Sequence, residues 1–218
     1  SDGRLASLFA PIGCGSCQPR GVTIDPRGRF LYIAYSNANI VSAYGINVDG
    51  TLSFIIDDSS VTNPFSVTID PAGRFAYITS FNNASVSAFA IQANGSLSSV
   101  DTDAGTVGVQ ASIAAGGGTH AFTIDSTGRF AHAANFNDNT VAAYTVNAST
   151  GALTAVGAPV LVGGLNPRSV SVDPSGKFVY VANYGSANVS AYSIDATTGA
   201  LTALAGSPFT AGANPGSV

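Results

Sequence analysis

The sequence predicts an all-β protein made of repeated four-stranded antiparallel units. Composition and an internal repeat both point to this fold class. The chain contains no Glu, Met or Trp, and Lys177 is its single lysine, so several of the best helix-forming residue types are missing or rare. Gly, Ser, Thr, Asn and Val are abundant, which is typical of short strands joined by tight turns.

A repeated layout covers almost the whole chain. Its units begin 45, 55, 48 and 48 residues apart, at Pro19, Pro64, Thr119, Pro167 and Pro215. Tandem four-stranded units of about 45 residues are typical of β-propeller blades, because each blade buries its faces against its neighbours. A β-solenoid is the competing architecture, but its rungs are usually shorter than these units. We therefore expect a β-propeller with four complete blades and a partial strand at each end.

Four short strands are expected in each unit. In the first unit the innermost strand covers residues 22–24 and ends at the turn Asp25–Gly28, whose Asp, Pro and Gly suit their positions in a type I turn. The second strand covers residues 30–34 and the third residues 41–44, with an Asn-rich loop between them. Because Asn tolerates positive φ, these loops fit tight turns, although a polar ring suited to carbohydrate or peptide is the alternative. A turn ending in Gly then leads into the fourth strand through one leucine per unit: Leu52, Leu97, Leu153 and Leu201.

The repeat also sets the expected domain boundaries. We expect a single propeller domain or a fragment of one, in which residues 1–18 form a partial blade and a cysteine loop, the four blades cover 19–63, 64–118, 119–166 and 167–214, and residues 215–218 start a further blade. Residues 2–5 match residues 49–52, the entry to a fourth strand, and the chain does not begin with Met. The sequence therefore predicts a piece of a larger propeller, or a ring that closes by borrowing strands from another copy.

The repeats resemble the YVTN-type repeats of the lactonase-like (6-phosphogluconolactonase-like) β-propeller family. The stretch from Ser171 to Thr202, SVDPSGKFVYVANYGSANVSAYSIDATTGALT, carries this resemblance most plainly, and the resemblance extends over nearly every residue. It implies a propeller fold. Members of the family include lactone hydrolases, related cycloisomerases and many surface or periplasmic propellers without known chemistry, so the motifs are specific for fold and weakly specific for function.

Charge and hydropathy exclude several classes of protein. The net charge is only −4 and no basic cluster exists, so no nucleic-acid partner is expected. No apolar run approaches the ~20 residues that a membrane helix needs, so no membrane insertion is expected either. The low content of charged residues and the many Asn and Ser residues predict a secreted, periplasmic or cell-surface protein. No cofactor is expected, and no histidine has a spacing partner that suggests a metal site.

In the blade arrangement that the family resemblance implies, the residue after each unit's first residue enters the strand nearest the central channel, where propellers concentrate function. In the four complete units these residues are Arg20, Phe65, His120 and Arg168. Arginine suits recognition of a carboxylate or phosphate, and His120 suits a general base near neutral pH. The sequence therefore predicts a ligand-binding rim made of these four residues. The alternative is that they are solvated loop residues that vary freely.

The remaining histidine and the two cysteines are expected to be structural. His132 replaces a tyrosine that recurs at one position of the second strand, which predicts a packing role. Cys14 and Cys17, in the sequence CGSC, fit a small disulfide loop in an oxidising compartment. Free thiols or a bond between chains are the alternatives.

These observations favour a secreted repeat module with a non-catalytic binding or structural role over an enzyme. The expected partner is a protein, a carbohydrate or a small anionic ligand, and open blade edges would allow a homo-oligomer. The alternative function is a lactone hydrolase, with His120 as base and Arg20 or Arg168 as anion clamps. Only His120, in GGGTHAFTID, resembles the His-containing segment that the family resemblance associates with lactonases. The loop at residues 133–140 departs from the Asp-containing stretch of active members.

Overall fold

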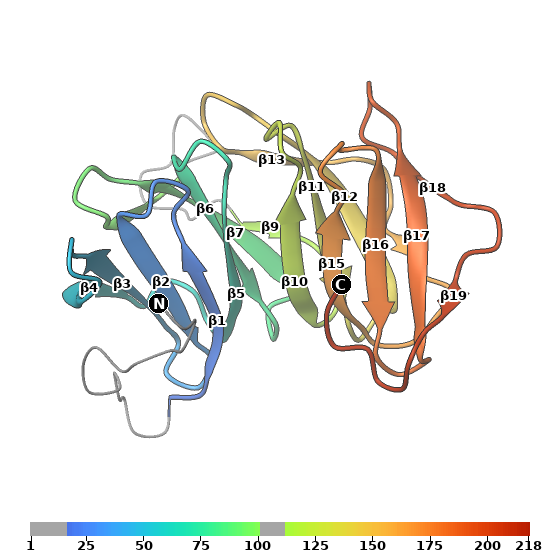
Figure 1. Ribbon diagram of the computed structural model, residues 1–218, viewed down its shortest axis with the longest axis horizontal. Coiled ribbons are helices and arrows are strands. Elements are labelled where there is room, and N and C mark those ends of the chain that lie inside the picture. The colour runs from blue at the N-terminus through green and yellow to red at the C-terminus, as the bar shows by residue number, and fades with distance from the viewer. Residues whose placement is uncertain (1–16, 101–111) are drawn as a thin grey trace.

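The computed structural model describes residues 17–100 and 112–218, which form four antiparallel sheets, one for each predicted unit (Figure 1). The first sheet contains β1 (Pro19–Ile24), β2 (Phe30–Tyr35), β3 (Ile40–Ile46) and β4 (Leu52–Asp58). The second contains β5 (Pro64–Ile69), β6 (Phe75–Ser80), β7 (Ser85–Ile91), β8 (Leu97–Ser99) and β9 (Ser112–Ala114). The third contains β10 (Thr119–Ile124), β11 (Phe130–Asn135), β12 (Thr140–Val146), β13 (Leu153–Ala155) and β14 (Val160–Leu161). The fourth contains β15 (Pro167–Val172), β16 (Phe178–Asn183), β17 (Asn188–Ile194), β18 (Leu201–Ala203) and β19 (Phe209–Thr210).

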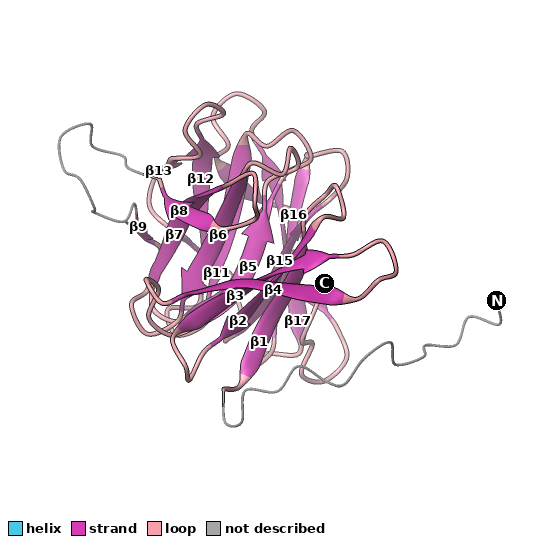
Figure 2. Cartoon of the chain, turned by 90° about the vertical axis from the view of Figure 1, so that its left-hand side faces the viewer, coloured by secondary structure: helices cyan, strands magenta, loops and turns pink. Residues whose placement is uncertain are grey.

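These sheets confirm the predicted all-β class and the four blades, each with its strands in chain order. Strands and loops account for all of the described residues, which therefore include no helix that could cross a membrane (Figure 2). No group of three or more His, Cys, Asp or Glu side chains among them could hold a metal ion. Of the predicted cysteine pair, Cys14 lies outside the described residues, and Cys17, just before β1, is not a free thiol.

The outermost strand differs from the single fourth strand that the sequence predicts. Only the first blade has a continuous outer strand, β4, whose register with β3 shifts between Ala43 and Tyr44. In the other three blades the third strand pairs with two short segments, as β12 does with β13 and β14. The residues between β13 and β14 include Gly157, which has a φ of 66°, and Pro159, and neither residue suits a continuous strand.

The turn after each innermost strand is held by its aspartate. One carboxylate oxygen of Asp25 accepts hydrogen bonds from the backbone N–H groups of Arg29 at 2.5 Å and Phe30 at 2.8 Å. Burial by itself would raise the pKa of Asp25, but these bonds and the Arg29 guanidinium lower it below its usual range. The same pair of backbone bonds recurs at the corresponding aspartates of the other blades, Asp70, Asp125 and Asp173.

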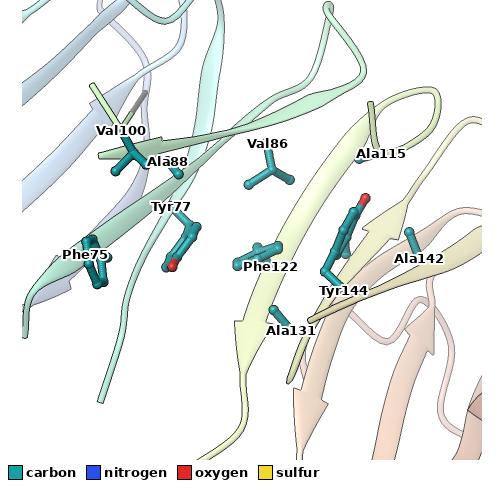
Figure 3. Close-up of a cluster of buried hydrophobic side chains, with 11 residues drawn as sticks. Phe75, Tyr77, Val86, Ala88, Val100, Ala115, Phe122, Ala131, Ala142 and Tyr144 are labelled. Atoms are coloured by element: carbon teal, nitrogen blue, oxygen red, sulfur yellow. The ribbon is translucent and has the colours of Figure 1, made fainter. Parts of the chain in front are cut away.

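Neighbouring blades pack face to face through apolar side chains. Figure 3 shows the layer between the second and third blades, where the Tyr77 ring lies 5.4 Å from the Phe122 ring, centroid to centroid. The Tyr77 hydroxyl crosses this layer and donates a hydrogen bond to the Gly151 carbonyl at 2.8 Å. Gly151 has a φ of 77°, and a Cβ at this position would lie 2.5 Å from the Phe75 ring. The glycines that end the outer turns of the second, third and fourth blades, Gly95, Gly151 and Gly199, are therefore required both by their positive φ and by the phenylalanine of the preceding blade.

The start of each blade is marked by one backbone feature. The residues before Pro19, Pro64, Thr119 and Pro167 all have positive φ: Gln18, Asn63, Gly118 and Asn166. Asn214, before Pro215, has the same feature with a φ of 54°, and the Val218 N–H donates to the Ser169 hydroxyl at 3.2 Å. The last residues thus repeat the opening turn of a blade beside β15, without forming a strand. The partial strand predicted for the N-terminal end lies outside the described residues.

Candidate functional site

The four innermost strands lie side by side in the order β1, β5, β10 and β15 (Figure 1). A cavity of about 440 Å³ opens near their starting ends. The second residue of each of these strands lines the cavity: Arg20, Phe65, His120 and Arg168. The loops that follow each second strand complete it with Ser36, Asn37, Phe81, Asn82, Phe136 and Tyr184. Gln18 and Asn63, from the opening turns, also contribute.

A β-bulge presents each of the four strand residues to the cavity. In β1, Pro19 pairs with Tyr35 and Gly21 with Ala34, so Arg20 is left between two consecutive pairs. The register shifts in the same way around His120 and Arg168, and over a slightly longer stretch around Phe65. Bulges re-aim side chains and are common beside active sites. The repeated turn and bulge therefore direct one variable side chain per blade to a common place.

His120 lies among aromatic rings and near two cations. Its ring centroid is 4.2 Å from that of Phe65 and 5.8 Å from that of Phe136, with the latter ring nearly parallel. The pKa of His120 is lowered to about 4, first by burial and then by the positive charges of Arg168 and Arg20, while a hydrogen bond with the Arg168 backbone opposes this shift. The imidazole is therefore neutral at neutral pH and can accept a proton.

Both arginines of the cavity stack on aromatic rings. The Arg20 guanidinium carbon lies 5.2 Å from the Phe65 ring centroid, and that of Arg168 lies 4.8 Å from the Tyr184 ring centroid. Arg20 also donates a hydrogen bond to the Gln18 side chain at 3.2 Å. Within residues 17–100 and 112–218, no carboxylate forms a salt bridge with either guanidinium. Two oriented cations with unpaired charge are suited to holding an anionic group.

The structure brings together the four residues that the sequence places on a rim, and it adds aromatic residues that were not predicted from the sequence. The missed residues are the aromatic ones that open the loops after β6, β11 and β16, namely Phe81, Phe136 and Tyr184. A signal was present, because an aromatic residue recurs there in three of the four units. The loop after the second strand of every blade contains one residue with positive φ, but this residue is Asn only in the first and third blades, at Asn39 and Asn139. In the second and fourth blades it is Ala84 and Ala187.

Repeated four-stranded blades with a cavity at the ends of their innermost strands define a β-propeller whose site is assembled from at least two residues per blade. A family model described as lactonase, seven-bladed β-propeller, matches residues 68–215, more than half of the chain. The chain therefore belongs to this lactonase family. No curated protein matches its sequence.

Solved structures of related proteins share the fold. A candidate 6-phosphogluconolactonase from Bacteroides uniformis is 21% identical with a TM-score of 0.78, and one from Bacteroides fragilis is 23% identical with a TM-score of 0.77. Each match covers 91% of this chain and 56% of the other. The periplasmic gluconolactonase of Pseudomonas aeruginosa is 26% identical, with a TM-score of 0.72, 89% of this chain covered and 55% of the other. The chain thus spans slightly more than half the length of these relatives.

Proposed function

We propose that this chain forms the substrate cavity of a lactone hydrolase. The observation that carries the proposal is a neutral imidazole, His120, in one cavity with the guanidinium groups of Arg20 and Arg168, with which no carboxylate of the described residues pairs. Membership of the lactonase family and the likeness to the Pseudomonas periplasmic gluconolactonase also support it. These comparisons favour the hydrolase over the non-catalytic module that the sequence alone favours.

The proposed reaction assigns one role to each polar group. His120 accepts a proton from a water molecule, whose oxygen attacks the lactone carbonyl carbon. The negative charge that develops on the carbonyl oxygen is stabilised by a guanidinium group, and the other guanidinium holds an anionic substituent of the substrate. The C–O bond of the ring then breaks, and the protonated imidazole returns its proton to the departing alkoxide oxygen. The products are a hydroxy acid and neutral His120.

The test is hydrolysis of gluconolactone and 6-phosphogluconolactone by the purified chain and by the variant His120→Phe. Phenylalanine keeps a ring against Phe65 and Phe136 but cannot accept a proton. We expect turnover above the buffer rate for the natural chain and a loss of about 10²–10⁴-fold in the variant, the usual contribution of a general base. Equal rates for the two proteins, or no turnover of either lactone, would refute the proposal.

A non-catalytic anion-binding role is the second candidate, and the stacked arginines favour it because they would serve binding without any chemistry. Titration with gluconate and inorganic phosphate separates the two candidates when it is combined with the rate measurements. Binding without turnover supports the second candidate. In either case Arg20→Ala should weaken binding, whereas Arg27→Ala should not, because Arg27 is exposed outside the cavity and its side chain reaches only the Ala72 carbonyl, at 3.4 Å.

A further inference from the structure

A second cavity, of about 300 Å³, lies between the second and third blades. Its wall comes from the aspartate turns that follow β5 and β10 and from Ala148 in the outer turn of the third blade. The cavity that contains His120 opens at the starting ends of these two strands, so the second cavity lies at their opposite ends, and the two cavities share no lining residue. Both blades that form it have a further blade of the chain on their other side.

Two arginines line the second cavity, one from each blade: Arg74 and Arg129. Each stacks on the phenylalanine that follows it in the sequence. The guanidinium carbon lies 5.3 Å from the Phe75 ring centroid in the second blade and 4.9 Å from that of Phe130 in the third. Stacking on an aromatic face holds a guanidinium in place and leaves its N–H groups available at the edge of the plane.

Arg74 is paired within its own turn. Its Nε lies 3.6 Å from Oδ2 of Asp70, as that of Arg29 lies 3.3 Å from Oδ2 of Asp25 in the first blade. The other oxygen of Asp70 accepts the backbone N–H bonds of Arg74 and Phe75. Asp70 also lines the second cavity, but both of its oxygens are engaged by the turn.

Arg129 has no such partner. In its turn the Thr127 hydroxyl donates to Oδ2 of Asp125, the oxygen that faces the guanidinium in the first two blades. The residues at the position of Thr127 in those blades are Arg27 and Ala72, and they leave that oxygen to the arginine. Within the described residues no carboxylate forms a salt bridge with Arg129.

Ser126 is a second departure in the turn of the third blade. The other three turns have proline at this position, namely Pro26, Pro71 and Pro174, so only Ser126 has a backbone N–H there. The Ser126 hydroxyl is already engaged, because it donates to the Pro174 carbonyl at 3.2 Å. This turn therefore has one additional backbone donor and one unpaired cation, on residues that line the same cavity.

We propose that the second cavity is a ligand site that binds the phosphate or sulfate group of a small molecule. Two arginines against one carboxylate leave a net positive charge, and the planar fork of Arg129 suits the oxygens of such a group. Arg74 adds a second positive charge and the Ser126 N–H adds a donor. The cavity is larger than the anion alone, so the part of the ligand that carries the anion lies against Pro71 and Ala148.

Titration of the natural chain with inorganic phosphate, followed by the amide chemical shifts of Ala72 and Gly128, tests the site. Both residues line the second cavity and neither lines the His120 cavity, so they report on this site alone. We expect a saturable shift with a dissociation constant of about 1 mM at low salt, because exposed charges are screened by water and ions. Sulfate should act in the same way, and glycerol phosphate should bind more tightly than inorganic phosphate.

Chloride at the same ionic strength is the control for general screening. The absence of a saturable shift with phosphate and sulfate, or an equal shift with chloride, would overturn the proposal. Glycerol phosphate that binds no more tightly than inorganic phosphate would overturn the assignment of a carried group in favour of the free ion.

A matched pair of arginine variants tests the cation. Arg129→Gln should raise the dissociation constant of phosphate at least about tenfold, because it removes the charged fork. Arg29→Gln should leave the constant unchanged, because Arg29 makes the same stack, 4.8 Å from the Phe30 ring centroid, but lies outside the second cavity. Equal effects of the two variants would show attraction by overall charge rather than by a site, and would overturn the proposal.

Two substitutions that copy the neighbouring blades test why the third blade differs. Thr127→Ala copies Ala72 and lets Asp125 pair with Arg129, and Ser126→Pro copies the other three turns. Each should weaken phosphate binding about two- to tenfold, the usual contribution of one hydrogen bond. Both sequences already occur in turns of this chain, so we expect unchanged thermal unfolding.

Undiminished phosphate binding by Thr127→Ala would overturn the role of the unpaired arginine. None of these readouts depends on turnover, so they stand or fall separately from the hydrolase.

Discussion

His120 and His132 both have a pKa lowered to about 4, with burial as the largest cause, but their surroundings differ. His120 lines the cavity, where Arg168 and Arg20 also lower its pKa. His132 is fully buried inside the third blade, and neither of its ring nitrogens has a hydrogen-bond partner. A buried polar group without a partner destabilises the fold, so His132 is tested by measuring stability. His120 lines the cavity and is tested by measuring activity.

Replacing His132 by tyrosine should stabilise the protein. At the same position in the first and second blades, Tyr32 and Tyr77 each donate a hydrogen bond to a glycine carbonyl of the next blade. For His132 in the third blade, the corresponding glycine is Gly199 of the fourth blade. His132→Tyr should raise the free energy of unfolding by about 1–2 kcal/mol, because a buried unpaired group is replaced by a hydrogen-bonded one. Urea denaturation measures the change. In the same assay Tyr77→Phe should cost about 1 kcal/mol, and a destabilised His132→Tyr would contradict this account of the blade interface.

At the scale of elements, each blade depends on the aspartate turn that joins its first two strands. The carboxylate accepts hydrogen bonds from the backbone N–H groups at the start of the second strand. It thereby fixes the position of the phenylalanine that begins this strand and packs against the glycine of the next blade. The turn therefore connects local backbone geometry to packing between blades.

Asp70→Ala should destabilise the protein much more than Asp49→Ala. Asp70 accepts bonds from the buried backbone N–H of Phe75 and from that of Arg74, whereas Asp49 is exposed and bonds only to Thr51. We expect a loss of about 1–3 kcal/mol for Asp70→Ala, from donors left unpaired, and a far smaller loss for Asp49→Ala, whose partners are exposed to water. Urea denaturation midpoints would report both values. Similar losses for the two variants would show that the turn does not have this role.

At the scale of the whole molecule, the sequence predicts the architecture well because each unit repeats the same signals. The Asp-x-x-Gly turn, the spacing of apolar residues and the glycine of the outer turn occur in register, and all four blades follow from them. The split outer strands were not predicted, because the interrupting residues such as Gly157 and Pro159 look like a loop that follows a complete strand.

The cavity was predicted only in part for a related reason. Arg20, Phe65, His120 and Arg168 stand at one repeated position, so their convergence follows from the repeat. The lowered pKa of His120 and the contact of its ring with Phe65 depend on packing between different blades. No single repeat contains that information.

The pH dependence of lactone hydrolysis tests the central claim most directly. His120 must be unprotonated to accept a proton, and its pKa is lowered from the ordinary 6.5 to about 4. We therefore predict that kcat/KM rises with pH through about 4 and is constant from pH 5.5 to 7, and that His120→Phe removes this titration together with most of the rate. A profile that rises instead near pH 6.5, or one that persists unchanged in His120→Phe, would contradict the assignment of His120 as the base.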